Sequence, residues 1–323
     1  MAKRPSKPVS SRRKPAQPKP KDQATSRHVA KVTLQSVADR RQSMQERVAR
    51  DRAQRYSAYL QQIEHPAERA GVGVRSLAAT AARRRLRILA EGDSWFEYPL
   101  PLIGGDGVIV QLERLLGYPI LNMAHHGDEV RQMLALQQRR EIIARLSDPN
   151  IRFDAMLFSG GGNDLVGNQF CLWLKDVQTG VPPEQLLNDE RVKAIIGTVE
   201  AGYEDLIEIR NRHSPNTALF LHGYDFPKAT GIGVCGVGPW LKPSLDFRGI
   251  HVPTDQFRVV KEFLTRFGNR LRTLANPTQK IFYVPTQGVL NPDTDWQNEI
   301  HPTSTGFKKI ANEFKKELEK VFP

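Results

Sequence analysis

Short apolar runs alternate with segments of helical periodicity from about residue 84 to residue 321. Apolar runs of about four to eight residues are typical of buried strands, and apolar residues spaced by three and four positions are typical of helices. The runs predict five strands, over residues 86–90, 119–123, 153–158, 217–221 and 280–284. The periodic segments predict helices over residues 108–116, 128–146, 183–212, 255–275 and 303–321. This alternation predicts an α/β fold, a three-layer α/β/α sandwich with a five-stranded parallel sheet. Residues 223–250 show little periodicity and are predicted to be a loop-like insertion.

The N-terminal quarter of the chain breaks this pattern. Residues 1–33 are rich in Lys, Arg, Pro, Ser and Gln, a composition that does not offset the entropy of ordering, so a basic disordered arm is predicted. From about Leu34 to Glu64 apolar side chains recur at loosely helical spacing, and residues 34–83 are predicted to be a charged helical extension. The remaining residues, 84–323, are predicted to form the α/β domain.

The net charge of +12 is concentrated in the first 57 residues. Residues 1–57 hold 16 Lys and Arg against 4 Asp and Glu, whereas the rest of the chain holds 31 of each kind. A basic arm is typical of contact with a polyanion such as nucleic acid or an anionic membrane. A solubilising tail or a tether to a protein partner fits the same composition equally well.

Targeting and redox signals are sparse. The Ser11–Lys14 stretch has two arginines but is followed by Pro, Gln and Lys instead of an apolar region, so no signal peptide is predicted. The chain has no run of about 18 apolar residues, and therefore no predicted membrane span. Cys171 and Cys235 form neither a disulfide framework nor a metal-ligand cluster. The expectation is a cytoplasmic protein, and the oligomeric state is left open.

Four polar motifs carry the candidate chemistry, three of them directly after predicted strands. In chain order they are Gly-Asp-Ser94, Asn-Met-Ala-His-His-Gly127, Gly-Gly-Gly-Asn163 and Asn-Glu-Ile-His301. Folds of this class build their sites where the carboxyl ends of parallel strands meet, so we expect these motifs to lie together. A serine hydroxyl is a poor nucleophile until a base removes its proton, and the motifs supply both a serine and a histidine.

The four motifs, in this order, resemble those of the SGNH (GDSL-type) hydrolases, a family of esterases, lipases, acyltransferases and carbohydrate deacetylases. The resemblance spans residues 86–305, and the residues that name the family match as Ser94, Gly127, Asn163 and His301. It implies a flavodoxin-like strand order, 2-1-3-4-5. It also implies Ser94 as nucleophile, His301 as general base and an oxyanion site formed by Gly127 and Asn163. No metal or organic cofactor is implied.

Each of these residues also has a structural interpretation. Ser94 can cap a following helix, Gly127 can be a turn glycine, and Asn163 can hydrogen-bond its own backbone. His301 can be a surface histidine beside the capped helix start at Thr303. The functional interpretation is favoured because it accounts for all four motifs together.

The last motif departs from the family pattern. Members usually have an aspartate three residues before the histidine, and this chain has Asn298 there. An asparagine can accept the imidazole N–H but lacks the charge that stabilises an imidazolium. Asp295 lies three residues further back and is the preferred candidate to orient His301. Asn298 is the alternative, and a backbone carbonyl would leave a Ser–His dyad.

The sequence therefore predicts a serine hydrolase that cleaves an acyl ester or an O-acetyl group through a Ser94 acyl-enzyme. The alternative is a binding protein that keeps this fold without catalysis and engages nucleic acid or another acidic partner through its arm. Tyr98 and Trp240 suggest an apolar side to the pocket. His125 and His126 can line it, and His222 either faces the site or is an edge residue of the sheet. The acyl group and the alcohol remain open.

Overall fold

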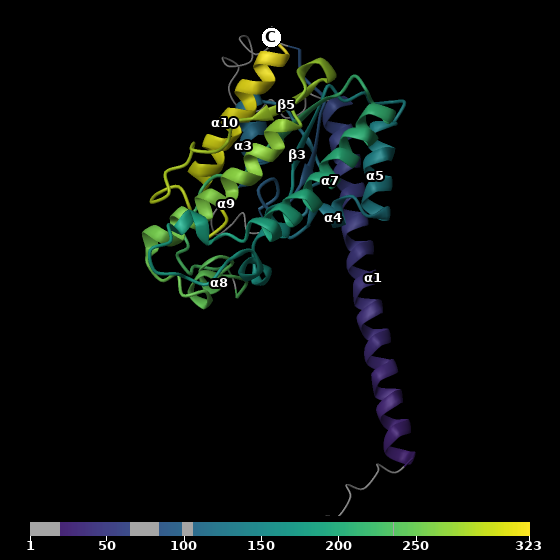
Figure 1. Ribbon diagram of the computed structural model, residues 1–323. Helices are drawn as coiled ribbons and strands as arrows, with labels where there is room; N and C mark the ends of the chain where they lie inside the picture. The colour runs from purple at the N-terminus through teal and green to yellow at the C-terminus, as the bar shows by residue number, and fades with distance from the viewer. Residues whose placement is uncertain (1–19, 65–83, 99–105, 235) are drawn as a thin grey trace, which may run out of the picture. The chain divides into compact units, whose positions relative to one another are not determined.

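The computed structural model describes residues 20–64, 84–98, 106–234 and 236–323 (Figure 1). The chain divides inside helix α1 (Pro20–Glu64) into two units, one ending at Ala53 and a larger one, Gln54–Pro323, that holds the sheet. No helix in the described part of the chain is both long and apolar enough to cross a membrane.

Helix α1 ends at Glu64, where the helical periodicity of the sequence ends, but it starts earlier than that periodicity suggests. It begins at Pro20, inside the arm predicted to be disordered. Proline is tolerated in a first helical turn, and no proline occurs from residue 21 to 65, where good helix formers such as Arg, Gln, Ala and Glu predominate. Residues 1–19 of the predicted arm and 65–83 of the predicted extension lie outside the described residues.

The last part of α1 belongs to the larger unit. Tyr59 is only 3% exposed and its ring stacks on Phe153 at a centroid distance of 6.3 Å. The division between the two units falls between residues 53 and 54. Tyr56, Leu60 and Ile63 of the same segment are partly buried against the core as well.

The sheet confirms the predicted architecture. Its strands are β1 (Ile88–Gly92), β2 (Leu121–Asn122), β3 (Ala155–Ser159), β4 (Ala218–His222) and β5 (Ile281–Val284). All neighbours are parallel, and the order β2-β1-β3-β4-β5 is the one implied by the family resemblance. Every residue of β1, β3 and β4 is buried, as their unbroken apolar character requires in a sheet covered on both faces.

Helices cover both faces of the sheet. They are α3 (Val108–Leu116), α4 (Val130–Met133), α5 (Leu136–Leu146), α6 (Gly162–Leu165), α7 (Asp189–His213), α8 (Lys242–Phe247), α9 (Pro253–Thr273) and α10 (Ser304–Val321), with 3₁₀ turns η1 (Asn168–Trp173), η2 (Pro183–Leu186) and η3 (Pro277–Gln279). Right-handed crossovers in this strand order place α3 and α10 on one face and α4, α5, α7 and α9 on the other. Figure 1 shows α3 beside α10, with α5 and α7 across the strands.

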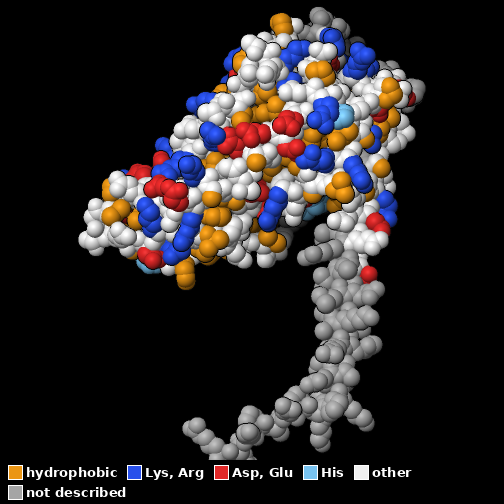
Figure 2. All heavy atoms as spheres, turned by 45° about the vertical axis from the view of Figure 1, so that its right-hand side comes forward, with side chains coloured by type: hydrophobic (Ala, Val, Ile, Leu, Met, Phe, Trp, Pro, Cys, Tyr) orange, Lys and Arg blue, Asp and Glu red, His pale blue; other side chains and the backbone are white. Residues whose placement is uncertain are grey.

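Two predicted elements differ in detail. The helix predicted over residues 128–146 is two helices, α4 and α5, separated by Leu134 and Ala135. The insertion predicted over residues 223–250 is irregular as far as Leu241 but then forms the short helix α8. On the face shown in Figure 2, acidic and basic side chains are interspersed over the larger unit, in line with the balanced charge of residues 58–323.

Candidate active site

Ser94 lies in a tight turn at the carboxyl end of β1. The Asp93 N–H donates to the Ser159 carbonyl at 3.1 Å, which ties the turn to β3. The Phe96 N–H closes the turn onto the Asp93 carbonyl at 3.1 Å, and the Trp95 N–H donates to Asp93 Oδ1 at 3.0 Å. Residues 93–97 are turn and bend, so Ser94 does not cap a helix that follows directly. The turn leaves the Ser94 side chain on the wall of a pocket.

A buried carboxylate underlies this turn. Asp93 is 2% exposed, and besides Trp95 its carboxylate accepts from Ser159 Oγ at 3.1 Å and from the Tyr224 hydroxyl. Burial raises the pKa of Asp93 to about 6, although the three donors act in the opposite direction. Asp93 therefore fixes the nucleophile turn to β3 and to the segment after β4.

His301 and Asn298 form a hydrogen-bonded chain with the serine. The distance from His301 Nε2 to Ser94 Oγ is 2.8 Å, and from His301 Nδ1 to Asn298 Oδ1 it is 3.0 Å. Asn298 Oδ1 also accepts from the backbone N–H groups of Ile300 at 3.1 Å and His301 at 3.0 Å. Two backbone donors identify this atom as the oxygen, so Nδ1 must carry the ring proton. Nε2 is then the unprotonated nitrogen facing the serine hydroxyl.

The carboxylate preferred from the sequence does not occupy this position. Asp295 Oδ2 accepts from the Asn291 N–H at 2.7 Å and from Lys309 Nζ at 2.6 Å. This pairing holds the loop against α10 and keeps the carboxylate away from the imidazole. The expectation that Asp295 orients His301 is corrected: Asn298, the alternative, makes the contact with Nδ1.

The imidazole of His301 is enclosed by aromatic rings. His301 is 4% exposed, with Tyr98 edge-on at 5.0 Å and Trp240 edge-on at 5.6 Å between ring centroids. Burial, and secondarily the charge of His126, lower the pKa of His301 to about 3. The ring is therefore neutral at neutral pH, the state a general base requires. Tyr98 and Trp240, expected from the sequence on an apolar side of the pocket, contact this ring instead of lining the pocket beside Ser94.

The loop that follows β2 carries Gly127. This residue has φ = 84°, in the left-handed region, and open space lies where a side chain would project. The His125 N–H donates to the Gly92 carbonyl at 2.9 Å, and Asn163 Nδ2 donates to the Asp128 carbonyl at 3.0 Å. The glycine thus lies between two hydrogen-bonded residues of this loop, His125, which is bonded to the end of β1, and Asp128, which is bonded to Asn163.

Asn163 lies in the short helix α6, directly after the glycines that follow β3. Gly161 has φ = 102°, and a side chain there would meet Phe267 at 2.7 Å and Val199 at 2.9 Å. These contacts require glycine and bring α6 close to the sheet edge. One hydrogen of the Asn163 amide is used by Asp128, which leaves the second for another acceptor.

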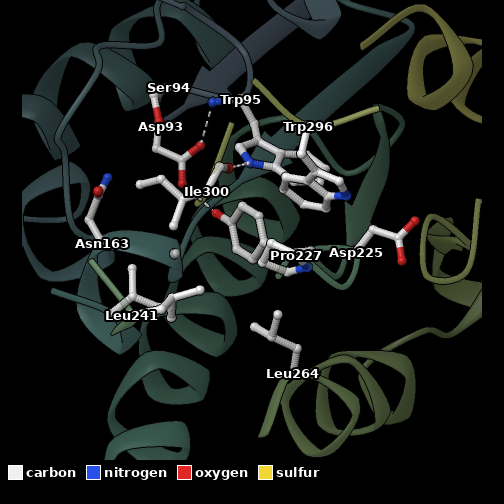
Figure 3. Close-up of a pocket in the computed structure, with 13 residues that line it drawn as sticks. Asp93, Ser94, Trp95, Asn163, Asp225, Pro227, Leu241, Leu264, Trp296 and Ile300 are labelled. Atoms are coloured by element: carbon white, nitrogen blue, oxygen red, sulfur yellow. Dashed lines mark hydrogen bonds between the residues drawn. The ribbon is translucent and has the colours of Figure 1, made fainter. Parts of the chain in front are cut away.

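The pocket beside Ser94 is mainly apolar. Figure 3 shows Ser94, Asp93 and Asn163 on one side and the adjacent rings of Trp95 and Trp296, 6.1 Å apart, on another. The lining residues are Asp93, Ser94, Trp95, Gly162, Asn163, Val166, Tyr224, Asp225, Pro227, Leu241, Leu264, Trp296 and Ile300. Asp225 is no free charge in this pocket, because backbone N–H groups of residues 226, 288 and 290 donate to it.

The other candidate histidines have different surroundings. The rings of His125 and His126 stack at 4.6 Å, with His125 Nδ1 3.4 Å from Asp128 and His126 Nδ1 3.8 Å from Glu97. His222 is fully buried among aromatic rings and does not line the pocket, which favours the structural interpretation of this residue. Burial lowers its pKa to about 4.

Sequence reasoning missed one residue of the site loop. Glu299, between Asn298 and His301, is fully buried and accepts four backbone hydrogen bonds. Its neighbours in sequence give no signal for this, because the donors lie some 60 residues earlier. Within the described part of the chain, no group of three or more His, Cys, Asp or Glu side chains is arranged to hold a metal ion.

Comparisons with known proteins give structural neighbours only. No protein-family model matches this chain, and no curated protein does. The chain is similar in structure to the lipase Lip_vut3 from a goat rumen metagenome, at 16% identity and TM-score 0.47, over 72% of this chain and 97% of that one. It is also similar to a Clostridium thermocellum family 3 carbohydrate esterase, at 20% identity and TM-score 0.43, over 74% and 98%. A third neighbour is Axe2, an acetylxylan esterase from Geobacillus stearothermophilus, at 14% identity and TM-score 0.44, over 73% and 95%.

These three neighbours are named as a lipase, a carbohydrate esterase and an acetylxylan esterase. The resemblance of this chain to that family rests on its own features. They are the four motifs, the strand order β2-β1-β3-β4-β5 and the meeting of Ser94 with His301 at the carboxyl edge of the sheet.

Proposed function

We propose that this protein is a serine hydrolase that cleaves short acyl esters through a Ser94 acyl-enzyme. The observation that carries the proposal is the hydrogen bond of 2.8 Å between Ser94 Oγ and an imidazole nitrogen whose protonation state is fixed from the other side. A nucleophile in contact with a base that is itself oriented by a third group is the arrangement on which acyl transfer by serine depends.

The reaction has two steps. His301 Nε2 takes the Ser94 proton as Oγ attacks the ester carbonyl, and the imidazolium then gives that proton to the departing alcohol. In the second step His301 takes a proton from water, the water oxygen attacks the acyl-enzyme carbonyl, and the carboxylic acid leaves as Ser94 regains its proton.

The tetrahedral oxygen that forms in each step needs hydrogen-bond donors. We assign this role to the backbone N–H groups of Ser94 and Gly127 and to the free hydrogen of the Asn163 amide. The negative charge that develops here also raises the basicity of the nearby imidazole. This coupling lets a histidine with a low pKa in the free protein accept a proton when the substrate reacts.

The pocket favours a short acyl group. Its interior volume is about 40 Å³, whereas one water molecule requires about 10–15 Å³. Leu241, Val166 and Ile300 give it an apolar lining, which suits the methyl or ethyl end of an acyl chain. Acetyl and propionyl esters are therefore the proposed substrates, and the alcohol lies toward solvent.

The test is hydrolysis of a series of aryl esters, together with covalent labelling by a fluorophosphonate probe. The wild-type protein should hydrolyse aryl acetate and take up one probe per chain, and Ser94→Ala should abolish both while unfolding at the same temperature. A Ser94→Ala protein with wild-type turnover would refute the proposal. A wild-type protein that neither turns over the ester nor reacts with the probe would favour a binding protein of this fold.

A further inference from the structure

Glu299 connects the loop that carries the general base to the irregular segment after β4. Its carboxylate is fully buried, and Oε1 accepts from the N–H groups of Gly231 at 2.7 Å and Lys242 at 3.1 Å. Oε2 accepts from Trp240 at 2.6 Å and Leu241 at 2.7 Å. The Glu299 N–H itself donates to the carbonyl of residue 232 at 3.3 Å, so five hydrogen bonds join the two segments.

The charge of Glu299 is balanced by backbone dipoles. Among the described residues no Lys, Arg or His forms an ion pair with it, and Lys242 Nζ pairs with Asp246 instead. Four converging N–H groups form a concave anion site of the kind that backbone nests provide. An irregular segment has no ladder partners for its N–H groups, so Glu299 supplies acceptors that the segment otherwise lacks.

The residues held by this carboxylate form part of the active site. Trp240 contacts the imidazole of His301 edge-on, and Leu241 lines the pocket beside Ser94. The Trp240 carbonyl in turn accepts from the Gly167 N–H at 3.1 Å, which extends the connection to the segment that follows Asn163. The position of the pocket wall relative to the base is therefore fixed through Glu299.

We propose that Glu299 is a positioning residue that sets acyl-chain specificity by holding the pocket wall at Leu241, together with the adjacent Trp240 that contacts the imidazole, against the His301 loop. This inference rests on the proposed ester hydrolysis. With the carboxylate in place the pocket stays narrow and selects short acyl groups. When it is lost, the wall moves away, the pocket admits longer chains, and the imidazole loses its edge contact with Trp240.

The test variant is Glu299→Gln, which keeps the size of the side chain. Its NH₂ group presents hydrogens to two backbone N–H groups in place of an acceptor, so two of the four bonds are lost. The matched control is Asp293→Asn. Asp293 lies on the same loop and pairs with Lys228 at the start of the same segment, but this ion pair is exposed and should contribute little.

Two measurements are made on each protein. The first is kcat and KM for aryl acetate and aryl hexanoate, and the second is hydrogen exchange of the amides of Gly231 and residues 240–242. In Glu299→Gln the ratio of kcat/KM for acetate over hexanoate should fall at least about tenfold, mainly through KM for acetate, and the four amides should lose protection. Asp293→Asn should match the wild type in both.

The outcomes separate the two proposals. Loss of thermal stability in Glu299→Gln with an unchanged acetate-to-hexanoate ratio would show a purely structural role and overturn the inference. If Glu299→Gln does not fold, Glu299→Asp, which keeps the charge but shortens the reach, carries the same test, and failure of both to fold also overturns it. A wild-type protein inactive on both esters would refute the hydrolase proposal, whereas unchanged amide protection in Glu299→Gln refutes the positioning role alone.

Discussion

Replacing Asn298 by aspartate tests how the general base of this site is controlled. In the wild-type protein Asn298 Oδ1 is 3.0 Å from His301 Nδ1 and is held by two backbone N–H groups. Asn298→Asp keeps an oxygen at that position and adds a negative charge beside a buried imidazole. The same backbone donors stabilise the ionised carboxylate, so the charge is expected to form.

The size of the effect follows from the distance. Two unit charges about 4 Å apart interact by about 4 kcal/mol at an effective dielectric constant near 20. At 1.36 kcal/mol per pH unit, this interaction raises the pKa of the imidazole by about three pH units. The pKa of His301 should therefore rise from about 3 in the wild type to nearly its ordinary value. Activity requires the neutral imidazole, so kcat/KM falls as the pH drops through this pKa.

The increase in kcat caused by Asn298→Asp should be smaller than the decrease in kcat that the reverse substitution, aspartate to asparagine, causes in a serine protease. There, replacing the aspartate by asparagine lowers kcat about 10⁴-fold, largely because the imidazole is held in the wrong tautomer. Here Asn298 already imposes the correct tautomer, so only the charge is added, and kcat should rise about 10- to 100-fold. Stability should fall by about 1–3 kcal/mol, because an ionised carboxylate replaces a neutral amide at a position that is only 3% exposed.

The assay is the dependence of kcat/KM on pH between about 4 and 9 for an aryl acetate, with product measured after quenching at one fixed pH. The wild type should be flat above about pH 5, and Asn298→Asp should lose activity below about pH 6. Asn298→Ala, which removes the orienting oxygen, should lower kcat without creating this limb. An Asn298→Asp profile that coincides with the wild-type profile would refute the assignment of Asn298 to the imidazole.

Three further predictions concern residues around the site. Asp295→Asn should leave kcat within about threefold of wild type but lower the free energy of unfolding, since it weakens the ion pair with Lys309. A loss of about 100-fold in kcat with an intact fold would indicate that Asp295 orients His301 after all. Deleting residues 1–53 should preserve turnover and weaken retention on a heparin column. Arg55→Ala in the full chain should instead lower kcat about 3- to 10-fold, because Arg55 Nη1 donates to the Ala124 carbonyl of the Gly127 loop at 3.2 Å. Equal kcat in Arg55→Ala and wild type would contradict this. Burial lowers the pKa of His222 to about 4 from 6.5, so the unfolded chain binds more protons between these values and stability falls as the pH drops through that window. His222→Phe should therefore gain about 2–3 kcal/mol relative to wild type between about pH 7 and pH 4.5 in urea unfolding, and a constant difference would show that His222 does not titrate in this way.

The parts of the fold that the sequence predicts are those determined by local pattern. Strand β3 is a continuous apolar run, and its limits differ from the prediction by no more than two residues. Helix α3 begins at Val108 and ends at Leu116, as predicted, because its apolar periodicity is clear and Gly117 ends it in a left-handed conformation. The start of α1 was missed because low hydrophobicity suggested disorder, although helix propensity persists in that segment.

In the active site, too, the residues that belong to a local sequence pattern can be predicted, and those that depend on distant contacts cannot. Ser94 and His301 are identifiable because each belongs to a short motif at a strand end or helix start. The choice between Asp295 and Asn298 depends on where a loop turns, and Lys309, on a different element, decides it by drawing the aspartate away. Glu299 is invisible in the sequence for a related reason, since its partners are backbone N–H groups, which leave no trace in residue identity.

Three side chains of this loop show how a buried base is kept neutral and oriented at once: Asp295, Asn298 and Glu299. A carboxylate next to the imidazole would stabilise the imidazolium and bring an ion pair into a site where desolvation is costly. The loop instead places an uncharged oxygen at Nδ1 and directs the two nearest carboxylates in sequence elsewhere, Asp295 to Lys309 and Glu299 to four backbone N–H groups. Within the described residues no carboxylate is hydrogen-bonded to the imidazole, so its first negative partner is the oxyanion that forms on the substrate. Proton transfer from Ser94 is thereby tied to attack on a bound ester, which disfavours a charged imidazole in the empty site.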